Sequence, residues 1–428
     1  MVSLQQPIEI NGCVIRNRLY RAPVLEGAGS GPDAPSIYRE AFEANARAGA
    51  GLIIQGNSCI TAEGRSSPGM TLVDTRQRTM ALREVTEAVH RQGGRIFLQV
   101  GHAGIYAMEA WHDTFAKRRT GPVIAVSKPP VHVRPALRGV PVKVLSTNDI
   151  RELAEATGRS SAWAREAGYD GIQLPSSNAK LIHQFLSPYY NRRTDEFGGS
   201  LRNRARILEL LADTIRRHAG EDFPLTVKIP MGEDAPPLSP RTTFQEGLEL
   251  CRMAEGFGYD AVTPVGLSVF PHGSLCRGAY PSSITDTKSI RERFNEALGH
   301  SRLKLAILRW GYRRAAIAYP FEPVWNRRYF SAAKQAVHIP VFAVGGIRTL
   351  QECEEILGRG EADMVGMGRP FYAEPELAAR LLSGNGDPVL CESSNRCLPA
   401  QQLGMKAACY NPNVAKKRAA MRRAVGAS

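Results

Sequence analysis

The sequence predicts a (β/α)8 barrel, also called a TIM barrel, with long loops after its third and sixth strands. Eight short apolar, β-branched runs alternate with amphipathic helical patterns. The runs are apolar at nearly every residue, which is typical of parallel strands covered on both faces. The count of eight favours a closed barrel over an open doubly wound sheet, and 428 residues accommodate a barrel of ~250 residues with insertions.

The strands and helices can be placed in chain order from these patterns. The predicted strands span residues 19–22, 52–55, 96–100, 171–174, 225–229, 261–265, 341–344 and 364–366. Helices are predicted at residues 75–92, 149–167, 203–218 and 350–359. Two of these helices begin with capping-box signals, Ser146 with Asp149 and Thr349 with Glu352.

Two connections are too long to be simple links, residues 101–146 and about 266–328. Both follow strands, so both should lie at the barrel face where active sites of this fold form. We expect irregular structure in both and one helix in the second. The predicted organisation is a barrel over residues 1–385, with the insertion at about 266–328, and a C-terminal extension over residues 386–428 that carries cysteines and a basic tail.

Composition narrows the class of protein. No apolar run reaches the ~20 residues of a membrane span, and the N-terminus lacks a signal-peptide pattern. We therefore expect a cytoplasmic protein with reduced thiols, a small-molecule substrate and no membrane or nucleic-acid partner. Assembly into a homo-oligomer is an open alternative. Much of the net charge of +14 lies in residues 291–328 and in the tail, a balance that can attract nucleic acid, an anionic membrane or an acidic ligand. A solvated surface is the simplest interpretation for the tail, and the basic loop after Gly266 is a candidate to receive an acidic part of the substrate.

Glycines follow the last two strands. VFAVGGI places Gly345 and Gly346 after the seventh strand, and DMVGMGRP places Gly368 and Arg369 after the eighth. Glycine lets the backbone approach a phosphate closely, and a guanidinium adds a matched charge. Because loops after strands seven and eight often bind phosphate in such barrels, we predict a phosphate site here, the alternative being two simple tight turns.

Several longer motifs carry a family resemblance. They are NRLYRAPV (17–24), AGLIIQGNSCITAEGR (50–65), FLQVGHAG (97–104) and QFLSPYYNRRTDEFGGSLRNRAR (184–206). With VGGI and GMGRPF, they make the chain resemble the old yellow enzyme family of FMN-dependent NAD(P)H:flavin oxidoreductases, which includes the 2,4-dienoyl-CoA reductase and trimethylamine dehydrogenase branches. The resemblance extends from about residue 10 to about residue 412.

The resemblance implies FMN across the barrel mouth, with NADPH or NADH as reductant. Pro23 and Val24 would lie beside the isoalloxazine, Asn57 near a flavin carbonyl, Gln99 on the pyrimidine ring and Lys228 near N1, where positive charge stabilises the reduced flavin. The phosphate would lie on Gly345, Gly346, Gly368 and Arg369. For Gln99 and Lys228 the alternatives are a core hydrogen bond and a surface lysine.

The segment after the fourth strand departs from the family. Ene-reductases there carry His, then His or Asn three positions on, then Tyr two further, and these bind the substrate oxygen and deliver the proton. This chain has Pro175, Asn178 and Lys180, and proline offers no donor. Asn178 and Lys180 are therefore the candidate catalytic residues. Lys180 either replaces the tyrosine as acid, pairs with a substrate carboxylate or phosphate, or points to solvent.

The trimethylamine dehydrogenase branch attaches FMN through a cysteine, and Leu25 stands at that position, which implies a non-covalent flavin. That branch also carries an iron-sulfur cluster on a cysteine pattern that here reads Cys391, Ser394, Cys397 and Cys409. A serine hydroxyl is a poor substitute for a thiolate, so no metal is predicted. The alternative is a labile cluster or zinc on the three thiols.

The leading hypothesis is an FMN-dependent oxidoreductase that transfers hydride between flavin N5 and an unsaturated carbonyl compound or related acyl thioester, with an altered proton-donor site. A second hypothesis keeps FMN and reverses the direction, as a dehydrogenase or amine N-demethylase. A third is a flavin-binding barrel without turnover.

Overall fold

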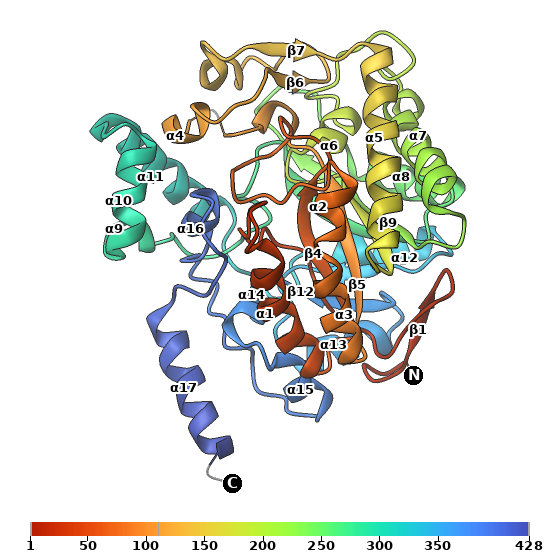
Figure 1. Ribbon diagram of the computed structural model, residues 1–428, viewed down its shortest axis with the longest axis vertical. Helices are drawn as coiled ribbons and strands as arrows, with labels where there is room; N and C mark the ends of the chain where they lie inside the picture. Colours follow the sequence, from red (N-terminus) through yellow and green to blue (C-terminus); the bar gives the residue numbers. More distant parts are fainter. Residues whose placement is uncertain (1, 110, 427–428) are drawn as a thin grey trace.

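The computed structural model describes residues 2–109 and 111–426. Its centre is one eight-stranded parallel sheet with the order β10-β9-β8-β5-β4-β3-β12-β11 (Figure 1). A parallel bridge between Val262 and Val341 joins the two ends of this order and closes the ring. The predicted barrel and its eight strands are confirmed. The strands are β3 (Leu19–Arg21), β4 (Leu52–Cys59), β5 (Arg95–Gly101), β8 (Gly171–Pro175), β9 (Leu225–Asp234), β10 (Ala261–Ser268), β11 (Phe342–Val344) and β12 (Met364–Met367).

Helices cover the outside of the barrel, which explains why the strands are apolar along their whole length. All eight residues of β4 are buried. Both predicted capping boxes form, at Ser146 before α5 and at Thr349 before α13. The covering helices are α1 (Ala34–Arg47), α2 (Arg76–Met80), α3 (Arg83–Arg91), α5 (Thr147–Glu166), α7 (Leu201–Ala219), α8 (Phe244–Gly256), α12 (Arg327–Ala336) and α13 (Leu350–Gly358).

The helix predicted at residues 75–92 is two helices, α2 and α3. Thr75 caps the first by accepting from the N–H of Arg78. The chain turns at Ala81 and Leu82, and Leu82 is buried in the core at this break. The helical spacing of apolar residues continues from α2 across the turn into α3, so periodicity alone predicted one helix.

The two long loops contain more regular structure than predicted. The first forms a parallel pair of short strands, β6 (Val123–Ala125) and β7 (Val142–Val144), with α4 (Asp113–Ala116) before them. The second contains three helices rather than one, α9 (Ser283–Asp286), α10 (Lys288–Ala297) and α11 (Arg302–Ala318). Few apolar residues of its helices are buried, and they share a small core with Leu398, Ala400 and Leu403 of the C-terminal segment. The surrounding basic residues therefore obscured the helical period.

The remaining elements flank the barrel. A hairpin of β1 (Ile8–Ile10) and β2 (Cys13–Ile15) precedes it. Two short 3-10 turns, Gly104–Tyr106 and Arg134–Leu137, lie in the first long loop. The other helices are α6 (Leu181–Leu186), α14 (Arg369–Ala373), α15 (Leu377–Leu382), α16 (Leu398–Gln402) and α17 (Pro412–Gly426).

The C-terminal segment returns to the barrel before it leaves it. Ala407 N donates to Glu26 O at 2.7 Å, and the main chain at Met405 lies so close to Gly27 that a side chain at position 27 would overlap it. In Figure 1, α16 lies against the loops of the barrel, whereas α17 extends away toward the C-terminus. No helix among the described residues combines the length and apolarity required to traverse a bilayer.

Candidate active site

A cavity of about 250 Å³ opens where strands of the barrel end. Pro175 is the last residue of β8, Val344 of β11 and Met367 of β12, and all three line it. Every predicted site residue also lines this cavity, although they come from distant parts of the chain. They are Pro23, Val24, Asn57, Gln99, Asn178, Lys180, Lys228, Gly345, Gly346, Gly368 and Arg369.

The glycines after β11 have left-handed backbone conformations. Gly345 has φ +115° and Gly346 φ +83°. A Cβ at Gly345 would lie 2.8 Å from the Asn326 side chain and 2.9 Å from Trp325. Asn326 is itself fixed, because its Nδ2 donates to Pro264 O at 2.8 Å. Glycine is therefore required here both by the backbone angle and by close packing behind the turn.

Two arginines lie near these turns. Arg369 donates to the side chain of Asn395 and, at 2.8 Å, to the carbonyl of Arg277. Arg348 donates to Ser393 and lies 3.6 Å from the centre of the Phe321 ring. Sequence analysis missed Arg348, although it directly follows the VGGI motif. The rim where β11 and β12 end is therefore strongly cationic.

Lys228 is a cation inside the cavity without a protein partner. Within the described ranges its side chain makes no hydrogen bond and no ion pair. Burial lowers its pKa to about 8, against a smaller opposite effect of Cys276. The surface alternative for this lysine is therefore wrong. Gln99 donates to Gln173 at 2.8 Å, so the core hydrogen bond considered for it exists, and Gln99 also lines the cavity.

The turn after β8 is strained and firmly held. Asn178 has φ +56° and Ala179 has φ +53°, a region that asparagine tolerates and alanine disfavours. The N–H of Ala179 donates to Nδ1 of His183 at 2.9 Å. The other ring nitrogen, Nε2, bonds the buried carboxylate of Glu233 at 2.5 Å. The histidine and glutamate thus fix a turn whose residues enter the cavity.

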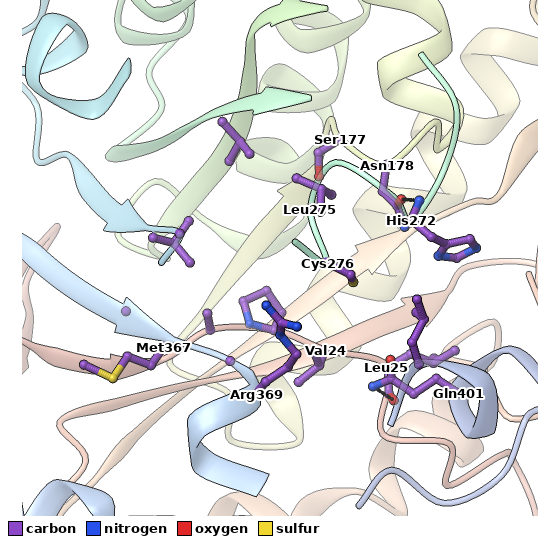
Figure 2. Close-up of a pocket in the computed structure, with 18 of the residues that line it drawn as sticks. Val24, Leu25, Ser177, Asn178, His272, Leu275, Cys276, Met367, Arg369 and Gln401 are labelled. Atoms are coloured by element: carbon purple, nitrogen blue, oxygen red, sulfur yellow. Dashed lines mark hydrogen bonds between the residues drawn. The ribbon is translucent and has the colours of Figure 1, made fainter. Parts of the chain in front are cut away.

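Asn178 is oriented by the loop after β10. Its Oδ1 accepts from the main-chain N–H of His272 at 2.6 Å, as Figure 2 shows. The His272 ring lies 3.2 Å from Oε1 of Glu109, and Oε2 of Glu109 accepts from Trp111 at 2.6 Å. Glu109 and His272 both line the cavity. Sequence analysis missed them because each lies in a long loop without a local motif.

Lys180 lines the same wall and is 8% exposed, so it does not point to bulk solvent. Burial lowers its pKa, and the nearby Glu109 and Cys59 oppose that effect. Its side chain has no hydrogen bond or ion-pair partner in residues 2–109 and 111–426. Two of its three alternatives, the acid and the anion partner, remain open.

The cysteine pattern surrounds a separate, smaller space. Cys391, Ser394, Cys397 and Cys409 line a cavity of about 20 Å³. Ser394 stands where the cluster pattern has a cysteine, and its hydroxyl accepts a hydrogen bond of 3.3 Å from the side chain of Asn411. Among the described residues no cluster of three or more His, Cys, Asp or Glu is suited to hold a metal ion.

Comparison with known families identifies this architecture. A model of the NADH:flavin oxidoreductase / NADH oxidase family matches residues 3–254 and 283–387, well over half of the chain. The chain belongs to this family. Membership agrees with the old yellow enzyme resemblance and makes the protein a flavin oxidoreductase by class, whereas its branch within the family stays a prediction.

Two curated relatives and one solved structure illustrate the match. The chain is 30% identical over 391 residues to a metal reductase of Desulforamulus reducens, covering 91% of this chain and 50% of the relative. It is 28% identical over 392 residues to an NADH oxidase of Thermoanaerobacter brockii, covering 90% and 52%. The chain thus spans about half the length of these relatives. The old yellow enzyme homologue of Zymomonas mobilis has the same fold, with TM-score 0.67, 20% identity and coverage of 96% and 98%.

Proposed function

We propose that the chain binds FMN non-covalently in the large cavity and, with NADPH or NADH as reductant, catalyses hydride transfer to an unsaturated carbonyl compound or a related acyl thioester. One observation carries this proposal. Eleven residues chosen from sequence for a flavin and its substrate line a single cavity at the strand ends. A relative named NADH oxidase supports the nicotinamide as electron source.

The cavity fits an FMN molecule chemically. Oδ1 of Asn57 is buried and has no hydrogen-bond partner in the described chain, so it can accept from a ligand donor such as a ring N–H. The unpaired ammonium of Lys228 can bind a negatively charged group of a ligand. The phosphate would lie at the cationic rim formed by Gly345, Gly346, Gly368 and Arg369. Leu25 lines the cavity and offers no thiol for attachment.

FMN, when bound, supplies a two-electron carrier that accepts and donates hydride. The residues of the chain position the reactants around it. Lys228 supplies fixed positive charge to the site, and Asn178 presents a donor whose orientation the His272 bond fixes. Pro175 contributes no donor. Polarisation of a substrate carbonyl is therefore weaker than with two donors, by a few kcal/mol if each is worth ~2.7–4 kcal/mol.

A second candidate is an FMN-dependent dehydrogenase or amine N-demethylase that works in the oxidative direction. The observation that favours it is Pro175 itself. An oxidation that starts from an amine or saturated substrate requires no carbonyl polarisation, so the missing donor costs nothing in that direction. The same flavin-binding residues serve both candidates.

One experiment separates these functions. The purified yellow holoprotein is mixed anaerobically with NADPH, NADH, an amine panel and an enone panel, and absorbance at the flavin band is followed. Bleaching by a nicotinamide and recovery on adding an enone supports the proposal. Bleaching by an amine alone supports the oxidative candidate. Bound flavin that no compound reduces supports a barrel without turnover, and a protein that cannot be reconstituted with FMN contradicts all three.

A further inference from the structure

Lys180 brings a charge into the cavity that no side chain of the described residues contacts in a hydrogen bond or ion pair. The residue is 8% exposed, and its side chain makes no hydrogen bond or ion pair within the described residues. The carboxylate whose charge acts on it is Glu109, and the two oxygens of Glu109 bond to His272 and to Trp111 rather than to Lys180. An unpaired buried ammonium is costly, so such a group usually has a function.

Besides the carboxylate of Glu109, the neighbours of Lys180 that line the cavity add hydrogen-bond donors. The Oδ1 of Asn178 is taken by His272, which leaves its Nδ2 group as the unpaired end of the amide. The hydroxyl of Ser177 has no side-chain bond among the described residues and also lines the cavity. In Figure 2, Ser177, Asn178 and His272 lie on one wall, and Met367 and Arg369 lie on another. This part of the cavity therefore combines an ammonium, an amide N–H and a hydroxyl with the carboxylate of Glu109, whose oxygens already accept from His272 and Trp111.

The chemistry of this wall selects the charge of the ligand. A neutral carbonyl would leave the ammonium uncompensated, whereas a carboxylate supplies one negative charge and two acceptor oxygens. One lysine and one oriented amide match that charge and that number of oxygens. A phosphate has a better-matched place at the arginine-rich rim across the cavity, near Arg348 and Arg369.

We propose that Lys180, assisted by Asn178, binds the carboxylate of a small organic acid, and that the unsaturated substrate of the proposed reaction carries such a carboxylate. The inference rests on the proposed function, since it takes this wall as the substrate side of a flavin site. It assigns Lys180 the role of a fixed positive charge. A lysine that retains its proton to bind an anion is not the proton donor of the reaction.

The test is a titration of oxidised holoprotein with non-reducible carboxylates, propanoate and 3-phenylpropanoate, followed by flavin absorbance. Matched amides and inorganic phosphate are titrated alongside. The variants are Lys180→Met, Lys180→Arg and the exposed control Lys128→Met, which removes the same charge outside the cavity. We expect Lys180→Met to weaken carboxylate binding about tenfold or more and to leave amide binding unchanged. Lys180→Arg should retain part of the affinity, and Lys128→Met all of it.

Three outcomes overturn the inference. They are equal carboxylate affinity in the wild type and in Lys180→Met, amide affinity equal to carboxylate affinity in the wild type, and phosphate competing at the same site with equal affinity. Calorimetric titration of flavin-free protein with the same carboxylates gives a second readout. If no flavin binds, the proposed function fails, while calorimetry still decides the role of Lys180. If flavin binds and Lys180→Met loses turnover without losing carboxylate affinity, Lys180 is the acid and the inference alone fails.

Discussion

The side-chain Oδ1 of Asn178 accepts a hydrogen bond of 2.6 Å from the main-chain N–H of His272, and this bond joins the turn after β8 to the loop after β10. The two residues are 94 positions apart in sequence. Asn178 also has φ +56°, so this residue serves two purposes. It tolerates the left-handed backbone, and it orients a donor toward the substrate wall.

Substitutions at Asn178 should separate these purposes. Asn178→Gly keeps the backbone relaxed and loses the amide, whereas Asn178→Ala loses the amide and adds the cost of a left-handed alanine. We expect Asn178→Ala to be less stable than Asn178→Gly by about 1 kcal/mol in urea unfolding. Both should raise KM for the substrate to a similar extent. Equal stability of the two variants would show that the turn relaxes and that the backbone angle is not constrained.

The buried pair of His183 and Glu233 should be essential for the same turn. Glu233 accepts from His183 at 2.5 Å and from Ser187 at 2.8 Å, and both side chains of the pair are fully buried. Glutamine has one acceptor oxygen where Glu233 uses two, so its NH2 group would face either His183 or the donors Ser187 and Thr242. Because this leaves buried donors unsatisfied and removes the buried charge, Glu233→Gln should lower the free energy of unfolding by about 3 kcal/mol. Chemical denaturation measures the loss.

The half-exposed pair of Arg252 and Glu249 provides a matched control for that substitution. Glu249→Gln makes the same chemical change on the surface and should cost less than about 0.5 kcal/mol. If Glu233→Gln and Glu249→Gln lower the free energy of unfolding equally little, the turn after β8 does not depend on the buried carboxylate.

Local patterns predicted the scaffold and the residues at the strand ends. Gly345, Gly346 and Arg369 follow strands that their own apolar runs reveal, and a barrel brings all strand ends to one face. Contacts between residues of different loops could not be predicted from local patterns. Glu109 and His272 are 163 residues apart and share no motif, so only the folded chain shows that together they fix Asn178. The helices α10 and α11 were obscured for a different reason, because their sparse buried residues are separated by arginines.

The cysteine-lined cavity should contain no resident metal. Its volume of about 20 Å³ leaves room for about one water molecule, and a hydroxyl at Ser394 stands where the cluster pattern requires a thiolate. We expect elemental analysis of anaerobically purified protein to find iron and zinc below about 0.1 atom per chain, and a chelator to leave Tm unchanged. Stoichiometric iron, or a Tm that falls on chelation, would contradict this expectation.

Lys228 should destabilise the flavin-free protein at neutral pH. Burial lowers its pKa from 10.5 to about 8 in the folded chain, so the unfolded chain binds this proton more tightly. The destabilisation is therefore complete below pH 8 and disappears as pH rises toward 10.5. Flavin-free Lys228→Met should be more stable than the wild type by about 2 kcal/mol at pH 7, and the difference should shrink by about pH 10. Urea unfolding of both proteins across this range measures it.

Bound flavin should reverse the stability order of Lys228→Met and the wild type. The ammonium that destabilises the flavin-free protein would stabilise the negative charge of the bound cofactor. FMN should bind Lys228→Met about tenfold more weakly than the wild type, as measured by fluorescence quenching of free FMN. Lys128→Met, which removes an exposed lysine, should match the wild type in both stability and flavin affinity. If Lys228→Met lost flavin affinity without gaining stability when empty, a partner in the protein would already neutralise the ammonium. A gain in stability with unchanged flavin affinity would instead place the cofactor away from Lys228.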